Sequence, residues 1–449
     1  MTTIPNVSLR SEQHQKLNSD LLSFLNASPT PFHATLNITT LLLDAGYQQL
    51  DEADAWDLAA KGKYFVTRND SSIIAWRQGS KPFSESGIGI VGAHTDSPCL
   101  SVRPNPELDT HGVLRLGVEV YGGVLLNPWF DRDLSLAGRV HYLNSGELNS
   151  ALVNFQCPIA TLPSLAIHLD REANSKRSIN AQNHTPVLLA TNKLKAKSNE
   201  TSKKQSAESV LHGLLKDHLK SLEIEAESIQ DYQLAFYDTQ AAAVIGIDGD
   251  FIASARLDNL LSCYLDTQAL VASDESNEWA MLVCNDHEEV GSQSHAGAAG
   301  PFLKQVLERI EPDGEALQRG ISQSMLISTD NAHALHPNHV DKMEPKHSPM
   351  LNAGPVIKVN ANQRYASNSE TQAVFRSLCE KMNVPVQTFV TRGDMGCGST
   401  IGPITAAEIG VKTLDVGLPT LGMHSIRELG GYEDTAHLYN ALTGFLARV

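Results

Sequence analysis

Five apolar, strand-like segments of this chain run directly into residues that can bind a metal ion. The segments are VGAHTDS, SARLDNL, CNDHEEVGS, ISTDNAHALHPN and LGMHSIRE. In an open α/β sheet, ligands bind beyond the carboxyl ends of the strands, so residues far apart in the sequence can meet there. We therefore expect an α/β fold in which one edge of the sheet collects these polar residues.

Apolar strands alternate with helical segments over the second half of the chain. Runs such as WAMLVCND, SMLISTDNA and VKTLDVGLP are separated by helical spacing, up to a final helix after Tyr432. Residues 88–91 are typical of a fully buried parallel strand. Nearer the N-terminus, the two prolines of ASPTPFHA should divide one helix from the next, and KYFVTRNDSSIIAWRQG predicts a hairpin.

The pattern of apolar and polar residues changes near Pro98. The segments GVLRLGVEVYGGVLL, AGRVHYL and LPSLAIHLDR alternate apolar and polar residues, which indicates antiparallel strands. With 449 residues, the chain exceeds the usual size of a single hydrophobic core. We expect a discontinuous α/β domain at residues 1–95 and 250–449, interrupted by an inserted, mainly β domain at residues 96–249.

The composition limits the partners and the cellular compartment that we expect. A formal net charge of −16 argues against nucleic acid or an anionic membrane as a partner, and the lysine-rich residues 191–209 are interpreted as a solvated, mobile loop. The cysteines lack CxxC spacing, as is typical of reduced thiols. Because a signal peptide and long apolar runs are also missing, we expect a soluble, cytoplasmic protein.

The strand-end residues include a set of ligands that suits a pair of zinc ions. Two imidazoles and three carboxylates are expected to converge, with one carboxylate bridging: His94, Asp258, Glu289, Asp330 and His424. Each motif alone is weak, and only the whole set points to a metal centre. Manganese or cobalt would suit the same nitrogen and oxygen donors.

Two further carboxylates have expected roles beside the metal. His94 and Asp96 are two residues apart and point the same way on an extended segment, so Asp96 can accept the second N–H of the imidazole. Consecutive side chains leave an extended backbone on opposite sides. We therefore expect Glu289 to bind metal while Glu288 stands off and holds a water.

A longer series of motifs occurs in order across nearly the whole chain. It comprises GAHTDSPCL, LNPWFDRDLSLAGRV, LPSLAIHLDR, SARLDNL, HEEVGS, STDNAHALHPN, GPVIKVNANQRYASN, CGSTIGP and MHSIRE. Together these motifs resemble the aspartyl aminopeptidase family of di-zinc metallopeptidases. The resemblance implies a zinc-exopeptidase-like, three-layer α/β domain with a mixed sheet, carrying an inserted β domain. The family forms tetrahedral dodecamers that admit only small peptides.

The resemblance also implies a role for each site residue. It divides the ligands of two zinc ions per subunit, with His94 and Asp330 on one, Glu289 and His424 on the other, and Asp258 bridging. Glu288 would be the general base that takes a proton from water and returns it to the leaving amine. His168 would come from the inserted domain of a neighbouring subunit and stabilise the developing oxyanion.

The expected substrate is a peptide with an acidic N-terminal residue. The family's pocket positions match Lys358 and Tyr365, with His333 nearby, and an ammonium with a phenol hydroxyl can pair with a carboxylate. We expect Glu289 to help bind the free α-amino group. However, EANSKRSINAQNHTPVLLA differs from the eukaryotic relatives, which indicates the bacterial branch and leaves broad or neutral specificity open.

Other functions remain as alternatives. A di-zinc carboxypeptidase or deacylase would use the same metal ligands, with Lys358 reassigned to a terminal carboxylate. A metal-stabilised scaffold would have no use for Glu288 beside a complete ligand set. A paired-carboxylate glycosidase would leave both histidines and the third acid unexplained.

Overall fold

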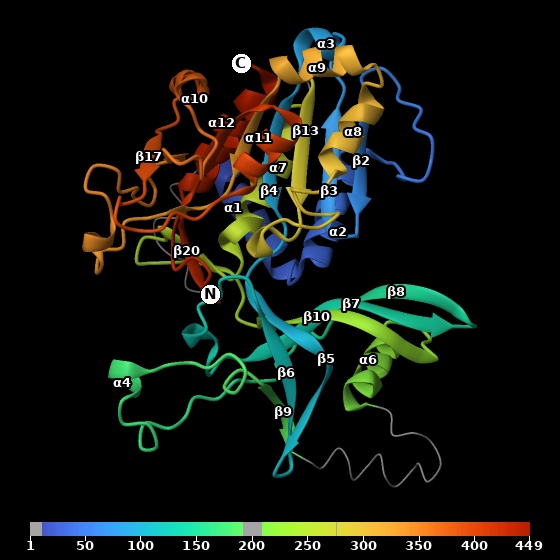
Figure 1. The fold of residues 1–449 in the computed structure, drawn as a ribbon, viewed down its shortest axis with the longest axis vertical. Helices are drawn as coiled ribbons and strands as arrows, with labels where there is room; N and C mark the ends of the chain where they lie inside the picture. Colours follow the sequence, from blue (N-terminus) through green and yellow to red (C-terminus); the bar gives the residue numbers. More distant parts are fainter. Residues whose placement is uncertain (1–10, 192–208, 275) are drawn as a thin grey trace. The chain divides into compact units, whose positions relative to one another are not determined.

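The computed structural model describes residues 11–191, 209–274 and 276–449. The chain divides into two compact units (Figure 1). The first unit comprises Met1–Ser97, Ala242–Met423 and Arg427–Val449, and the second comprises Pro98–Ala241 and His424–Ile426. Most of the lysine-rich segment predicted as a loop, residues 192–208, lies outside the described residues.

The first unit is built on a nine-stranded mixed sheet. In spatial order its strands are β1 (Gln48–Gln49), β2 (Lys63–Arg68), β3 (Ser72–Arg77), β13 (Ala280–Asn285), β4 (Gly89–His94), β14 (Met325–Thr329), β18 (Lys412–Gly417), β16 (Val356–Val359) and β17 (Gln387–Val390). Strands β13, β4, β14 and β18 are mutually parallel, so their carboxyl ends share one edge of the sheet. The predicted parallel strand at residues 88–91 and the predicted hairpin, now β2 and β3, are confirmed.

Helices cover both faces of this sheet. The helices of the first unit are α1 (Glu12–Ala27), α2 (Pro31–Asp44), α3 (Phe83–Ser86), α7 (Leu257–Ala272), α8 (Phe302–Ile310), α9 (Gly314–Gln323), α10 (Ser369–Lys381), α11 (Ile401–Ile409) and α12 (Asp434–Ala447). Alternate residues of β13 enter opposite cores: Leu282 packs with residues of α1, α7 and α12, whereas Met281 packs with residues of α8 and α9. This arrangement confirms the predicted three-layer α/β fold.

A smaller sheet completes the first unit. Its five strands, in spatial order, are β11 (Ala243–Ile245), β12 (Phe251–Ser254), β20 (Glu428–Gly431), β19 (Pro419–Leu421) and β15 (Ala332–His333). Short 3-10 turns lie at η3 (Glu288–Val290) and η4 (Val340–Lys342). The break between α1 and α2 falls at Ser28–Thr30, as the prolines of that segment predict.

The second unit is a six-stranded antiparallel sheet with one substantial helix. The strands, in spatial order, are β8 (Glu147–Asn154), β7 (Leu134–Asn144), β10 (Ser228–Asp238), β5 (Cys99–Thr110), β6 (Val113–Tyr121) and β9 (Val187–Thr191). The helices are α4 (Ala173–Lys176) and α6 (Val210–Ser221), with the 3-10 turn η2 at Asn127–Trp129. The antiparallel β structure predicted after Pro98 is therefore present.

One predicted strand of this unit is wrong. Residues 162–171, with the sequence LPSLAIHLDR, form irregular chain and a turn. Their alternation does not mark a buried face, because Leu165, Ile167 and Leu169 are exposed by 61%, 44% and 76%. Exposed apolar side chains close together in one segment are typical of a surface that another protein covers.

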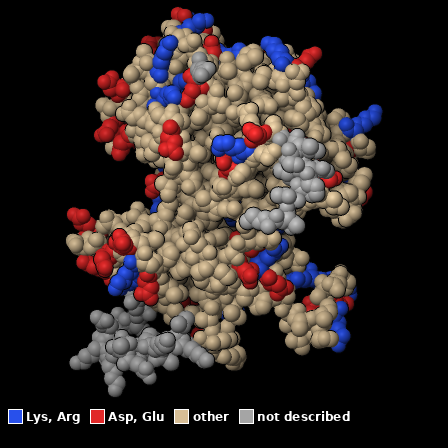
Figure 2. All heavy atoms as spheres, turned by 180° about the vertical axis from the view of Figure 1, so that it is seen from behind, with Lys and Arg blue, Asp and Glu red and all other residues tan. Residues whose placement is uncertain are grey.

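The charges on the surface are mixed. On the face shown in Figure 2, Lys and Arg side chains of each unit are interspersed with Asp and Glu side chains. Within the described part of the chain, no helix has both the length and the apolar character needed to span a bilayer.

Candidate metal centre

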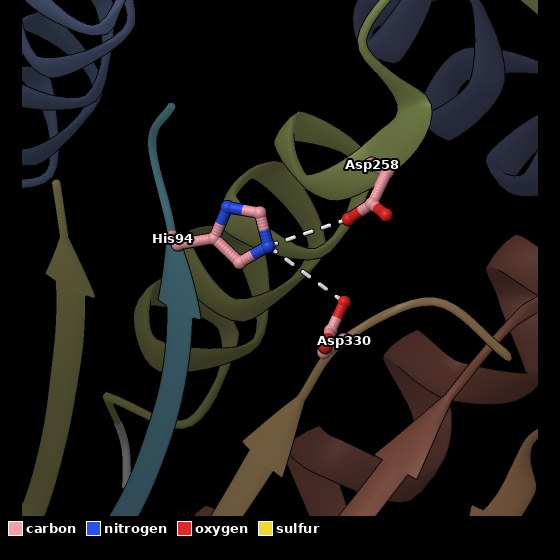
Figure 3. A group of neighbouring side chains, drawn as sticks. All are labelled: His94, Asp258 and Asp330. Carbon is pink, nitrogen blue, oxygen red and sulfur yellow. Dashed lines mark ion pairs between the residues drawn. The ribbon is translucent and has the colours of Figure 1, made fainter. Parts of the chain in front are cut away.

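His94 lies at the centre of the candidate site. It is the last residue of β4 and is almost fully buried, and its Nδ1 lies 3.0 Å from the backbone carbonyl oxygen of Asp96. Because a carbonyl only accepts, Nδ1 carries the hydrogen and Nε2 offers its lone pair. Nε2 lies 3.3 Å from Asp258 Oδ1 and 3.7 Å from Asp330 Oδ1 (Figure 3). A backbone carbonyl that fixes the tautomer in this way is typical of a metal-binding histidine.

Asp258 is positioned by an irregular start of α7. Its own φ and ψ, −83° and 105°, are not helical, and its backbone N–H donates to Glu428 Oε2 at 2.9 Å. The Asp258 side chain is thereby turned toward His94 (Figure 3). Glu428 is a buried residue whose part in the site the sequence analysis missed, although it ends the MHSIRE motif. The sequence does not indicate which backbone N–H will donate to an acidic side chain in a strand.

Asp330 follows β14 directly and is shared between His94 and a lysine. Its Oδ2 lies 3.3 Å from Lys358 Nζ, and Lys358 is only 2% exposed. Lys358 Nζ also donates to the carbonyl of Asn331 at 3.2 Å and lies 5.2 Å from the centre of the Tyr365 ring. The buried cation therefore fixes the carboxylate of Asp330 so that Oδ1 faces His94.

The two adjacent glutamates are held by Asp96. Its Oδ1 accepts the backbone N–H of Glu288 and its Oδ2 accepts that of Glu289, both at 3.1 Å. The expected extended backbone is wrong here, since His287 has a left-handed conformation and the glutamates form the turn η3. Asp96 Oδ1 also lies 3.4 Å from His94 Nδ1, so one buried carboxylate connects the histidine with both glutamates.

The chemistry of the donor atoms fits a metal ion. In each of two groups within the first unit, one ligand atom per residue lies within 4.8 Å of the others: His94 with Asp258 and Asp330, and His94 with Glu288 and Glu289. Neutral imidazole nitrogen and carboxylate oxygen are donors that zinc accepts. Because η3 is a tight turn, both glutamates face His94 instead of pointing apart.

The pKa values reflect this concentration of carboxylates. Burial by itself would lower the pKa of His94, but hydrogen bonds to Asp258, Asp330 and Asp96 raise it well above its usual value. The site therefore strongly favours a positive charge. Burial raises the pKa of Glu288 to about 7, with His94 opposing this shift and Asp330 and Asp258 adding to it.

Two of the predicted substrate residues, His333 and Tyr365, line a cavity of about 360 Å³, whereas Lys358 is not part of its lining. Tyr365 is buried and His333 is exposed, with the His333 ring 5.7 Å from that of Phe389. The cavity is lined by more cationic and titratable nitrogen groups than acids: His333, His336, His339, Lys342 and Arg392, against Glu344. The apolar part of its wall includes Met343, Phe389 and Met395.

The remaining two predicted residues belong to the second unit. His424 has a positive φ of 66°, and its Nδ1 lies 3.0 Å from the carbonyl oxygen of Gly123, which leaves Nε2 to offer a lone pair as in His94. A Cβ on Gly123 would lie 3.0 Å from this Nδ1 and would disturb the contact. His168 is exposed, in the turn that replaces the predicted strand.

Comparisons with known proteins find matches along nearly the whole chain. The sequence pattern of a family described as "Aminopeptidase I zinc metalloprotease (M18)" matches residues 24–446. The chain is 57% identical over 431 residues to a "Probable M18 family aminopeptidase 2" of Stutzerimonas stutzeri, covering 96% of this chain and 98% of that one.

Solved structures share the fold over nearly the whole chain. A structure described as the Ape4 and Nbr1 complex is 40% identical with a TM-score of 0.93, over 97% of this chain and 86% of that one. The mApe1 dodecamer of S. cerevisiae is 26% identical with a TM-score of 0.82, over 97% of each chain.

Proposed function

Since the chain belongs to the M18 family of zinc metalloproteases and is a metallo-aminopeptidase, we propose that it removes acidic N-terminal residues from peptides with a pair of zinc ions and Glu288 as the general base. One observation carries this proposal. His94 at the end of β4, Asp258 at the start of α7 and Asp330 after β14 place their donor atoms within 4.8 Å of one another, and donor atoms of Glu288 and Glu289 lie within the same limit of His94.

The ligands divide naturally between two ions. His94 and Asp330 would hold one, Glu289 and His424 would hold the other, and Asp258 would be shared by both. His94 belongs to both groups of neighbouring donors in the first unit, so Glu289 lies beside the first set of proposed ligands. His424 follows directly after Met423 of the first unit, and the contact of its Nδ1 with Gly123 favours the tautomer in which Nε2 carries the lone pair.

Glu288 is suited to move the proton. Bound zinc supplies the Lewis acidity that polarises a carbonyl group and makes water acidic near neutral pH. Glu288 accepts a proton from that water on its carboxylate and returns it to the leaving amine. Asp96 holds the backbone of Glu288 and so fixes where its carboxylate lies. Glu289, whose N–H bonds to the same carboxylate, is placed to meet the α-amino group.

The proposed preference for acidic residues rests on Lys358 and on the nitrogen groups that line the cavity. An ammonium has three N–H donors, and Asp330 and Asn331 occupy two of those of Lys358, which leaves one for a substrate carboxylate. Tyr365 contributes its hydroxyl, and His333 lies on the cationic side of the cavity. The apolar wall of the same cavity favours the second candidate, an aminopeptidase of broad specificity.

A substrate panel distinguishes these functions. We expect the protein to release the first residue of Asp-Ala-Xaa peptides and to hydrolyse Asp- and Glu-arylamides at higher kcat/KM than Leu- and Lys-arylamides. A chelator should abolish all four activities, and added zinc should restore them. Equal rates on the Leu-arylamide would replace acidic preference by broad specificity. Release of the last residue would instead identify a carboxypeptidase.

The proposal includes a homo-oligomer, with a tetrahedral dodecamer as the expected form. The S. cerevisiae relative is described as a dodecamer. In this chain, the exposed Leu165, Ile167 and Leu169 flank His168 and offer an apolar surface for a second copy. Such an arrangement would present His168 to the active site of a neighbouring subunit, where a donor stabilises negative charge on the carbonyl oxygen.

Complementation between inactive variants tests this contribution. We expect H168A and E288Q homo-oligomers to be nearly inactive, and co-expression of the two to restore part of the activity. In mixed assemblies, a subunit with intact Glu288 receives His168 from its E288Q neighbour. The control is co-expression of two H168A chains that carry different tags, which should stay inactive. If mixed assemblies form and stay as inactive as either parent, His168 does not act across subunits.

A further inference from the structure

Thr329 makes three hydrogen bonds at the point where the metal ligands meet. It is the last residue of β14 and precedes Asp330. Its Oγ1 lies 2.9 Å from the carbonyl oxygen of Gly92 and 2.5 Å from Asp266 Oδ2, and its backbone carbonyl accepts from Asn259 Nδ2 at 2.8 Å. All of these contacts are buried.

These contacts join the three elements that carry the first group of ligands. Gly92 lies two residues before His94 in β4, and Asn259 follows Asp258 in α7. Thr329 is therefore hydrogen-bonded to a residue near each of the other two ligands. A change at Thr329 would shift all three donor atoms relative to one another.

The protons of this network can be counted. A threonine hydroxyl carries one hydrogen, and the carbonyl oxygen of Gly92 can only accept it. If Thr329 donates to Gly92, the proton in the short contact between Thr329 and Asp266 must come from Asp266. An ionised Asp266 would instead take the single hydrogen and leave two acceptor oxygens, Thr329 Oγ1 and Gly92 O, facing each other at 2.9 Å.

The surroundings of Asp266 favour the neutral acid. Its side chain is fully buried, and Oδ1 has no hydrogen-bond partner among the residues that the structure describes. Burial raises the pKa of Asp266 well above its usual value, and the Thr329 hydrogen bond only partly opposes this shift. The nearby Cys263 thiol, on the preceding turn of α7, donates to the carbonyl of His94 and brings no positive charge.

We propose that Asp266 is a neutral carboxylic acid that donates a hydrogen bond to Thr329 and thereby positions the zinc ligands His94, Asp258 and Asp330. It is a positioning residue and touches neither substrate nor metal. The proposal depends on the metal site proposed above. It also predicts the protonation state of the Asp266 carboxyl group, which can be measured without zinc.

Two pairs of variants test the direction of the hydrogen bond. In D266N the amide can still donate to Thr329 but cannot carry a charge, so zinc affinity and kcat should stay within about threefold of wild type, against the roughly 10–100-fold losses typical when such supporting partners are removed. D266A and T329V remove the bond and should show those losses, mainly in kcat, with KM little changed. T329S keeps the hydroxyl and should behave like D266N.

A matched control separates positioning from general packing. T267V also removes the hydroxyl of a fully buried threonine. Thr267 lies in α7, and its hydroxyl donates to the carbonyl of Cys263 within the helix. It should cost stability similar to T329V but retain zinc in competition with a chelator. Circular dichroism at the assay temperature would establish that each variant is folded. If D266A does not fold, T329V against T267V decides the same question.

The proton itself is visible in the infrared. The difference spectrum between zinc-free wild type and D266N at pH 8 should contain the carbonyl band of a protonated carboxylic acid. A carboxylate band in its place would overturn the proposal, as would D266N losing as much zinc affinity as T329V. Equal zinc retention in T329V and T267V would also overturn it. Because the infrared sample holds no zinc, failure of the proposed metal site would leave this measurement intact.

Discussion

Replacing Glu288 by glutamine is expected to lower kcat on the order of 10³-fold while zinc stays bound, because general acid–base groups contribute effects of this size. Glutamine keeps the size of the side chain but cannot accept a proton at neutral pH. The backbone of residue 288 would remain on Asp96, since that hydrogen bond uses the main-chain N–H. The proposed ligands, including Glu289, are unchanged in this variant.

Zinc content and turnover must be measured on the same E288Q sample. Mass spectrometry of the metal, after dialysis, should give the wild-type stoichiometry, and the arylamide assay should give the loss in kcat. E308Q is the matched control, because Glu308 is an exposed glutamate of α8. Turnover of E288Q near that of E308Q would remove Glu288 from the mechanism. Loss of zinc would make it a ligand.

The strand-end rule located much of the site from sequence because the physics behind it is local. His94 ends β4 and Asp330 follows β14, and these strands are parallel neighbours. An apolar run followed at once by a polar ligand is visible in one short window of sequence. That the polar ends lie at one edge then follows from the parallel order of the strands.

Other features depend on contacts between distant segments and could not be predicted in this way. Nothing in the sequence near Lys358 indicates that it pairs with Asp330 while buried. Likewise, the turn at Glu288 and Glu289 depends on the left-handed His287 and on the carboxylate of Asp96, nearly 200 residues away. Periodicity alone favoured an extended chain there.

The segment around His168 shows the opposite error. Alternation of apolar and polar residues predicted a strand, because a strand with one buried face produces this pattern. Leu165 and Leu169 are instead exposed in an irregular segment. A pattern selected for contact with another protein can resemble one selected for a core, and a single chain cannot distinguish them.

Replacing Asp258 by asparagine is expected to weaken zinc binding at least about tenfold and to abolish most hydrolysis. Loss of a residue that only supports a ligand already weakens metal binding by about this factor, and loss of a proposed bridging ligand should weaken it more. The Glu428 contact would persist because it uses the backbone N–H of residue 258. The substitution therefore tests the carboxylate charge with little change in the local fold.

The thermal stability of D258N should respond to zinc in a distinctive way. Metal that binds only the native state stabilises it, so each tenfold loss of affinity removes about 1.4 kcal/mol of that stabilisation. Without metal, the same substitution relieves repulsion with Glu288 but also removes the ionic hydrogen bond to His94, and these two effects on stability oppose each other. The gap between the Tm values with and without chelator should thus narrow, mainly because the zinc-loaded Tm falls. D57N, at an exposed aspartate, should keep the wild-type gap. An unchanged gap and zinc content in D258N would show that this carboxylate does not bind the metal.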